Sequence, residues 1–358
     1  MLGRFLFRTL PFLAAMSGAA TAIVHGHDLS SVTQMEQDQG ANWYTTSGQK
    51  STIESILGDG GMDSVRLRLW TADEYGLSYT LALAQRFYKE GYKIYLDMHF
   101  SDNWADPSKQ AIPAAWSSSS ITTLASQLQT YVRQTLTSFH NGGVQVEILA
   151  LGNEIRNGML WPLGQISGSS YTNFAILWAA ARAGVNDAVS AGVPKPQVMI
   201  HLDDGWNESL MASWFKGVFA TGKVKTSDVD VFGFSFYPFY GTSATISNLQ
   251  ASLNNLASTY GKPMYVAETD WPVECSGVSL SANYPTSAQG QTEWVQAIES
   301  TLTSVPNGLG AGLFYWEPGF LNDSSLGSSC TSALLFDVDW SGWPTTKATA
   351  LSSVNMYK

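Results

Sequence analysis

Eight short runs of apolar, β-branched and aromatic residues punctuate the chain. Several of them are almost continuously apolar, as expected for strands that are buried on both faces of a parallel sheet. The pattern therefore predicts eight strands, at residues 23–29, 64–70, 93–100, 146–155, 197–204, 229–238, 264–271 and 310–318.

Segments with helical spacing lie between these runs. Apolar side chains share one helical face in residues 79–90, 121–140, 172–191 and 288–302, and Gly192 suits the C-terminal cap of the third segment. Strand and helix in repeated alternation predict an α/β fold, namely a single (β/α)8 TIM barrel. An open doubly wound sheet is the alternative. It would normally contain fewer units and often a glycine-rich phosphate loop, and neither common form of that loop occurs here.

The first 22 residues have the pattern of a secretory signal peptide. Arg4 and Arg8 flank a short apolar stretch, and the triplet Ala20-Thr21-Ala22 offers a cleavage site of small residues. The alternative is a buried N-terminal helix. The stretch is too short and too interrupted for a transmembrane helix. We expect a signal peptide at residues 1–22, a catalytic domain at 23–358, and a secreted, extracellular protein without a membrane partner.

The composition narrows the class of partner. Only 13% of the 358 residues are charged and the net charge is −10. This acidic balance argues against nucleic acid, whose phosphates require patches of Lys and Arg. It suits an extracellular protein that acts on a neutral substrate. We expect the protein to be a monomer.

Two glutamates carry the clearest chemical signal. Glu154 and Glu268 each stand at the end of a predicted buried strand, where a carboxylate is costly to desolvate. Two carboxyl groups on different strands are the minimum needed for acid/base and nucleophilic work on a glycosidic bond. For Glu268 the alternative is an ion pair with an inward-facing arginine. Asn153, beside Glu154, offers an amide suited to a sugar hydroxyl.

Polar and aromatic residues also gather at the ends of the other runs. In a barrel these positions meet at one face, so they predict a substrate-binding cleft. For any single residue, the alternative is a structural polar group or rim packing. The candidates are Arg66, Arg68, Asp97, His99, Trp104, Asn153, His201, Asp203, Tyr237, Trp271 and Trp316, with Tyr240, Asp270 and Glu317 nearby. Trp161, Trp271 and Trp316 are the preferred rings for stacking on a sugar face.

The histidines and cysteines give little further information about function. None of the five histidines has the spacing of a zinc motif, so we expect neither a metal nor a cofactor. Cys275 and Cys330 form one disulfide in an oxidising compartment, or else remain two buried thiols. Two sequons, which begin at Asn207 and Asn322, are candidate glycosylation sites.

Six ordered motifs together resemble the arabinogalactan endo-β-1,4-galactanases of glycoside hydrolase family 53, especially the secreted fungal kind. The motifs are DMHFSDNWADP (97–107), LGNEIRNGMLWPLG (151–164), HLDDGWN (201–207), FSFYPFY (234–240), AETDWP (267–272) and YWEP (315–318). The resemblance runs from about residue 25 to the C-terminal region. It implies a polysaccharide substrate and a retaining mechanism.

The resemblance also assigns residue roles. It implies that Glu154 is the acid/base and Glu268 the nucleophile, and that a disulfide joins Cys275 to Cys330 in the loops after strands seven and eight. The residues it places around the attacked sugar are Arg66, Arg68, His99, Asn153, Tyr237 and Trp316. A retaining pair predicts carboxyl groups about 5–5.5 Å apart.

Two points depart from the family. Relatives usually have Gly-Ala-Asp where this chain has Gly26-His27-Asp28, and a larger residue there is expected to reshape the cleft floor. Bacterial relatives bind calcium in a strand-end loop, and no acidic cluster here requires it. The rival functions are an endo-β-1,4-mannanase or cellulase on the same barrel, and a non-catalytic carbohydrate-binding barrel.

Overall fold

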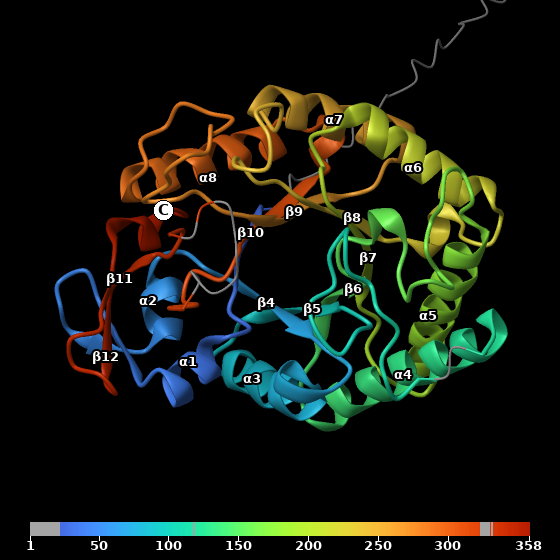
Figure 1. Cartoon of the computed structure of the whole chain (residues 1–358), viewed down its shortest axis with the longest axis horizontal. Helices are drawn as coiled ribbons and strands as arrows, with labels where there is room; N and C mark the ends of the chain where they lie inside the picture. Colours follow the sequence, from blue (N-terminus) through green and yellow to red (C-terminus); the bar gives the residue numbers. More distant parts are fainter. Residues whose placement is uncertain (1–21, 117–118, 323–329, 331) are drawn as a thin grey trace, which may run out of the picture.

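The computed structural model describes residues 22–116, 119–322, 330 and 332–358. Eight parallel strands close into a barrel in the order β1-β10-β9-β8-β7-β6-β5-β4 (Figure 1). Each lies within one of the eight predicted runs, so the predicted (β/α)8 barrel is confirmed. The strands are β1 (Val24–Asp28), β4 (Ser64–Leu69), β5 (Lys93–Met98), β6 (Val146–Leu151), β7 (Gln197–Leu202), β8 (Val231–Ser235), β9 (Met264–Thr269) and β10 (Gly310–Tyr315).

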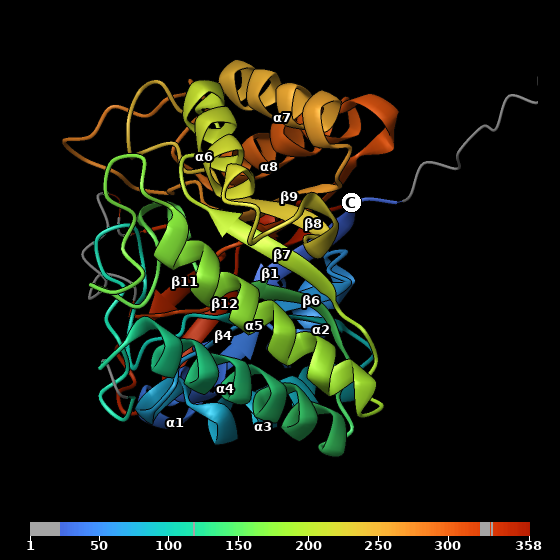
Figure 2. The ribbon, with the colours of Figure 1, turned by 90° about the vertical axis from the view of Figure 1, so that its right-hand side faces the viewer.

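Helices surround the barrel, and the four predicted helical segments match α3, α4, α5 and α8. Figure 2 shows α4 and α5 lying across one side of the strands. The helices are α1 (Val32–Asp38), α2 (Ile53–Asp59), α3 (Leu77–Lys89), α4 (Ile121–Asn141), α5 (Thr172–Ser190), α6 (Glu208–Ala220), α7 (Ile246–Tyr260) and α8 (Ala288–Thr303). Short 3-10 turns are η1 (Asp73–Tyr75), η2 (Ile155–Asn157), η3 (Thr226–Asp228), η4 (Pro306–Gly308) and η6 (Ser352–Asn355).

Side-chain hydroxyls and amides explain where several helices begin. Ser120, Asn207 and Thr245 each accept a backbone N–H from the first turn of α4, α6 and α7. Such caps satisfy donors that the helix itself leaves unpaired. The apolar stripe of each helix then packs on the outward-facing residues of the strands, such as Val65 and Leu67 of β4.

The interior of the barrel has two different halves. Alternate residues of a strand face inward. Toward the amino ends of the strands the inward residues form a separate apolar cluster, which includes Tyr95, Met199, Tyr265 and Phe314. Further along the same strands, at Asp97 of β5 for example, buried residues are charged. The strands therefore change from apolar packing to polar contacts toward their carboxyl ends.

A second, smaller sheet lies beside α1 and α2 and was not predicted from the sequence (Figure 1). Its order is β11 (Phe336–Asp339), β12 (Thr346–Ala350), β2 (Ala41–Tyr44) and β3 (Lys50–Ser51). These strands are short and alternate buried with exposed residues, so they contain no continuous apolar run. Trp43 and Phe336 pack edge to face beneath the sheet, with ring centroids 4.9 Å apart.

His27 does not shape the cleft floor, which corrects the expectation from the sequence. Its ring is fully buried and packs against Tyr315 and Tyr357. Asp28, one residue further on, instead contacts Arg66 inside the barrel. Burial, with a smaller contribution from His25, lowers the pKa of His27 to about 3, so the side chain is neutral at physiological pH.

The predicted signal peptide lies outside the described residues, except for Ala22. In the part of the chain that the structure describes, no helix combines the length and apolar character that a membrane span requires.

Candidate active site

The carboxyl ends of the strands open into one cleft. Asn153 and Glu154, which follow β6, line it together with Glu268 at the end of β9. Trp104, after β5, and Trp316, after β10, contribute aromatic rings whose centroids lie 6.2 Å apart. The two glutamates identified from the sequence therefore share one cavity, as a glycosidase requires.

Glu268 is held by two donors. Arg66 Nη2 donates to its Oε1 at 2.6 Å, and the hydroxyl of Tyr237 donates to its Oε2 at 2.8 Å. Only 6% of the residue is exposed. Both oxygens are thereby fixed in direction, which is the preorganisation that a nucleophile at a defined position needs. The ion pair with an inward-facing arginine, considered above as the alternative for Glu268, exists, and Glu268 still faces the cleft.

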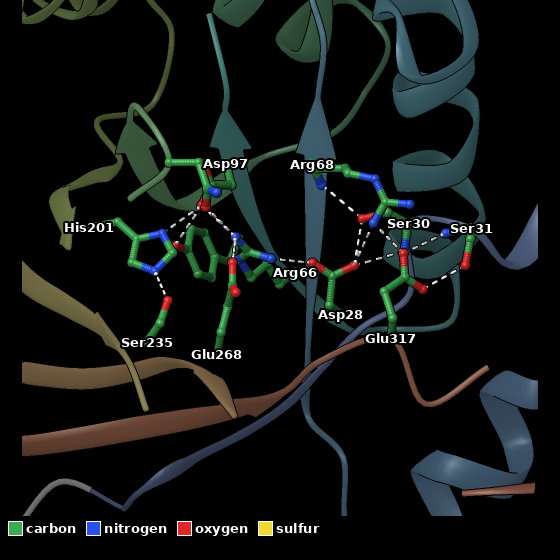
Figure 3. Close-up of polar contacts among 12 residues, drawn as sticks. Asp28, Ser30, Ser31, Arg66, Arg68, Asp97, His201, Ser235, Glu268 and Glu317 are labelled. Carbon is green, nitrogen blue, oxygen red and sulfur yellow. Dashed lines mark hydrogen bonds and ion pairs between the residues drawn. The ribbon is translucent and has the colours of Figure 1, made fainter. Parts of the chain in front are cut away.

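Arg66 is the centre of a buried network. Its Nη2 also donates to Asp97 Oδ2 at 2.7 Å, and its Nη1 donates to Asp28 (Figure 3). The same Nη2 donates to Asn153 Oδ1 at 2.9 Å. The guanidinium is 1% exposed, and several carboxylates compensate for its burial. A single side chain thus positions both Glu268 and the amide of Asn153, which stands beside Glu154.

Asp97 and His201 extend this network away from Glu268. His201 lies between Asp97, with Nδ1 to Oδ2 at 3.1 Å, and Ser235, with Nε2 to Oγ at 3.0 Å (Figure 3). Burial alone would raise the pKa of Asp97, but Arg66 and His201 lower it below its usual range. Asp97 therefore remains a carboxylate that can hold Arg66 in place.

Glu154 has a very different environment. Burial, then the negative charges of Glu268 and Asp203, raise its pKa well above the ordinary value. Its backbone is left-handed, with φ of 47°, which is uncommon outside glycine and typical of functional sites. Gly152 has φ of 103° just before it, and a side chain there would strike Ile155. The turn after β6 is therefore built to present Glu154 to the cleft in its protonated form.

The cleft continues past Glu154 into a second hollow. This part is lined by Arg156, Asp203, Asp204 and Trp206, and it shares Glu154 and other residues with the first part. Two of the three guanidinium nitrogens of Arg156 donate to Asp203, with Nε to Oδ1 at 2.9 Å and Nη2 to Oδ2 at 2.7 Å. The cleft thus extends on both sides of Glu154.

A second arginine fixes the aromatic side of the cleft. Arg68 donates to Glu317, and its guanidinium lies 4.0 Å from the ring centroid of Tyr75 and 4.5 Å from that of Trp104. The hydroxyl of Ser31 donates to Glu317 at 2.6 Å. Burial raises the pKa of Glu317 to about 7, although Arg68 opposes the shift. The cation–π contact holds the Trp104 ring in a defined orientation.

Several residues predicted to bind substrate lie beneath the cleft surface. Asp97 and His201 are fully buried, and Arg66, Arg68 and His99 are 1–2% exposed. None of these five lines the cleft. They contact one another and the residues that do line it, as Arg66 does with Asp97 and with Glu268. Burial, with Arg66 and Arg68 nearby, lowers the pKa of His99 to about 3, although Asp97 opposes this shift.

The stacking role predicted for Trp271 is wrong. Its indole is fully buried, packs 5.3 Å from Trp294 between ring centroids, and donates its N–H to the carbonyl of Pro285 at 2.9 Å. Trp161 is half-buried outside the two hollows, and its N–H bonds to the carbonyl of Asn157. Trp104 and Trp316 are the predicted tryptophans that line the first hollow.

Some lining residues were not predicted. Asp106, Lys109 and Phe239 stand in loops after β5 and β8, and Tyr240 and Asp270 were noted only as strand-end neighbours. Arg156, two residues after Glu154, was also overlooked. Their position within the conspicuous motifs was the available signal, but loop geometry decides which of them face the cleft.

Cys275 and Cys330 form a disulfide with their Cα atoms 5.0 Å apart, so the predicted pairing is confirmed. It joins the segments that follow β9 and β10. Asn207 caps α6 through its side-chain oxygen. Asn322 is exposed, and the other two residues of its sequon lie outside the described residues. Among the residues with a described placement, no group of three or more His, Cys, Asp or Glu could hold a metal ion.

Comparison with known proteins agrees with this geometry. A probable arabinogalactan endo-β-1,4-galactanase A of Aspergillus fumigatus is 42% identical over 351 residues, covering 95% of this chain and 96% of the relative. The arabinogalactan endo-β-1,4-galactanase A of Aspergillus niger is 40% identical over 347 residues, with 95% and 96% covered.

Solved structures of related proteins show the same similarity. A structure from a study of two fungal β-1,4-galactanases superposes with a TM-score of 0.86 at 39% identity, covering 93% of this chain and 98% of its own. The family 53 catalytic domain of Ignisphaera aggregans gives 0.78 at 25% identity, with 94% and 95% covered. The sequence pattern that defines glycosyl hydrolase family 53 matches residues 24–352. The chain belongs to glycosyl hydrolase family 53.

Proposed function

We propose that this protein is a retaining endo-β-1,4-galactanase that hydrolyses the β-1,4-galactosidic bonds of galactan and arabinogalactan. The observation that carries the proposal is the contrast between two glutamates in one cleft, of which Glu268 is buried and Glu154 half-buried. Glu268 is fixed by Arg66 and Tyr237, whereas burial and the charge of Glu268 keep the pKa of Glu154 high. Two carboxyl groups in such different environments take the roles of nucleophile and acid.

In the first step, protonated Glu154 donates its proton to the departing glycosidic oxygen. The carboxylate of Glu268 attacks the anomeric carbon, and the bond to the leaving sugar breaks. A covalent glycosyl ester on Glu268 results. The donors on Glu268 fix the direction of attack, since Arg66 and Tyr237 each hold one of its oxygens.

In the second step, Glu154 acts as the base. Once Glu268 is an ester, its negative charge is gone, and one cause of the raised pKa of Glu154 disappears with it. Glu154 then takes a proton from water, which attacks the anomeric carbon and releases the sugar with its original configuration. The same residue thus serves both steps because its neighbour changes charge.

The extent of the cleft supports cleavage of bonds within a polysaccharide. The hollow extends from Trp104 and Trp316 on one side of Glu154 to Arg156 and Trp206 on the other. The choice of galactan follows from the names of the Aspergillus relatives. Reducing-sugar release from β-1,4-galactan, β-mannan and carboxymethyl cellulose tests it. Release from galactan supports the proposal, whereas a preference for mannan or cellulose would show that galactan is not the substrate.

The stereochemistry of the product tests the mechanism. A retaining enzyme releases a β-anomer first, and its carboxyl groups lie about 5–5.5 Å apart. Proton NMR in the first seconds of hydrolysis distinguishes the anomers before mutarotation. An α-anomer as the first product would exclude the double displacement.

We also propose that the protein is exported after cleavage near Ala22 and acts as a monomer without a metal or cofactor. Its membership of a polysaccharide-degrading family supports export, because a polymer is met outside the cell. N-terminal sequencing of protein from the medium, light scattering, and activity in a chelator test these three points. An intact leader, a dimer, or loss of activity in the chelator would contradict them.

A further inference from the structure

The hairpin between β11 and β12 carries two tryptophans on its surface. Trp340 is 39% and Trp343 56% exposed, whereas the other eleven tryptophans of the described residues are buried or half-buried. The two ring centroids are 6.3 Å apart, and the planes are inclined by 41°. The rings thus form one continuous aromatic surface, which we call the hairpin platform.

Backbone contacts hold this platform in place. The N–H of Trp343 donates to the carbonyl of Trp340 at 3.1 Å, and the N–H of Thr345 donates to the carbonyl of Gly342 at 3.0 Å. The side chain of Asp339 accepts the N–H of Ser341 at 2.9 Å. A surface that is already ordered loses little conformational entropy when a ligand binds.

Polar groups of the outer face of the small sheet adjoin the platform. Asp339 lies opposite Lys347 in the β11–β12 register, and both are exposed. The ammonium of Lys347 is 5.0 Å from the ring centroid of Tyr44 on β2. Next to the exposed rings, therefore, hydrogen-bonding groups of opposite charge occur in balance, without a basic or acidic excess.

The platform is separate from the catalytic cleft. Its hairpin belongs to the small sheet, which lies outside the barrel beside α1 and α2 (Figure 1). Neither Trp340 nor Trp343 lines either part of the cleft. A ligand there would be held by the same molecule without blocking the glutamates.

The chemistry of the platform fits a neutral polysaccharide. A sugar ring offers an apolar C–H face to an aromatic ring and hydroxyls to the polar groups around it. Nucleic acid would require an excess of Lys and Arg, which the Asp339–Lys347 pairing does not provide. Two indoles are also far smaller than the roughly 800 Å² per partner of a stable protein interface.

We propose that the hairpin platform is a second polysaccharide-binding site, which holds a distant part of the polymer that the cleft cleaves. The identity of the sugar, galactan, rests on the proposed function. Holding the polymer at two points makes its entry into the cleft an intramolecular event with a higher effective concentration. The platform therefore favours long substrates and has no effect on short ones.

The test compares Trp340→Ala/Trp343→Ala with the unaltered protein and with Tyr88→Ala. Tyr88 is a matched control, because it is an aromatic residue of α3 with 38% exposure, away from the hairpin. Binding is measured by affinity electrophoresis in gels that contain β-1,4-galactan, with Glu268→Gln as a common background that stops hydrolysis. Kinetics are measured without that background, on polymeric galactan and on β-1,4-galactotetraose.

We expect the double variant to lose most of its retardation in the gel. Its KM on the polymer should rise roughly tenfold, below the gain that linking two sites can give, while kcat/KM on the tetraose stays unchanged. Tyr88→Ala should match the unaltered protein in every measurement. If the double variant is less stable, Trp343→Ala alone, which removes the more exposed ring, should show a smaller effect of the same kind.

Unchanged retardation by the double variant would overturn the proposal, as would an equal loss on polymer and tetraose. A change from dimer to monomer in light scattering would do the same, since the occupant would then be a second copy. Failure of the proposed function would look different. In that case the unaltered protein hydrolyses neither galactan substrate, while gels with mannan or cellulose still reveal whether the platform binds a polysaccharide.

Discussion

The two halves of the barrel interior are built from the same strands but by opposite rules. On β5, for example, Tyr95 belongs to the apolar cluster, and Asp97, two residues later, joins the ionic network. Packing of apolar residues stabilises without directing any chemistry. Buried ion pairs contribute little net stability, but they fix positions, and removal of one partner is costly. The barrel thus separates stability from reactivity along its axis.

The largest effect is expected at the catalytic end, from Glu268→Ala. Removing the nucleophile should lower kcat on galactan by roughly 10⁴-fold or more, because the covalent step is lost. Circular dichroism should show an unchanged fold, since Arg66 keeps its contacts with Asp28 and Asp97. Substantial residual hydrolysis would exclude Glu268 as nucleophile.

Arg66→Gln should damage both chemistry and stability. It leaves the carboxylates of Asp28, Asp97 and Glu268 without their shared cation, which costs about 3–5 kcal/mol of unfolding free energy. A misplaced nucleophile should lower kcat by roughly 100-fold. Urea unfolding and initial rates measure the two losses. A variant as stable as the parent would show that the network is not structurally important.

Met199→Ala tests the apolar half. The side chain is fully buried in the apolar cluster near the amino ends of the strands, so its truncation should cost about 2–5 kcal/mol of unfolding free energy. Measured well below the melting temperature, kcat should remain within about twofold of the parent, because no contact of either glutamate changes. A large fall in kcat with only a small loss of stability would break the proposed separation of the two halves.

Asp203→Asn should have the smallest effect, on pH dependence alone. The acid must be protonated, so activity is lost as the pH rises through the pKa of Glu154. The charge of Asp203 is one of the causes that raise this pKa, and its removal also leaves the cation of Arg156 less compensated, with only Asp204 at 3.7 Å as a carboxylate partner. Both changes lower the pKa of Glu154. The alkaline limb of kcat/KM against pH should therefore move to lower pH, and a shift upward would contradict this assignment.

The contrast between the halves also explains what the sequence could reveal. Continuous apolar runs identified all eight barrel strands. The small sheet was missed because its short strands alternate buried and exposed residues. Loop residues such as Lys109 carry no periodicity, so only the folded chain places them in the cleft.

Trp271 was misplaced because its face of the strand was ignored. Thr269, two residues earlier, faces outward and accepts the indole N–H of Trp294. Trp271 continues on that side and packs against the same ring. The period of two along a strand would have separated it from Glu268. His27 was misjudged in the same way, since its neighbour Asp28 is the inward residue.

The central claim is that Glu154 holds its proton partly because Glu268 is negatively charged. Carboxyl ¹³C NMR titration of Glu154, in the parent and in Glu268→Gln, measures this directly. In the parent, Glu154 should titrate well above the ordinary range for glutamate. In Glu268→Gln its pKa should fall, although burial keeps it raised. An identical pKa in both proteins would contradict the account.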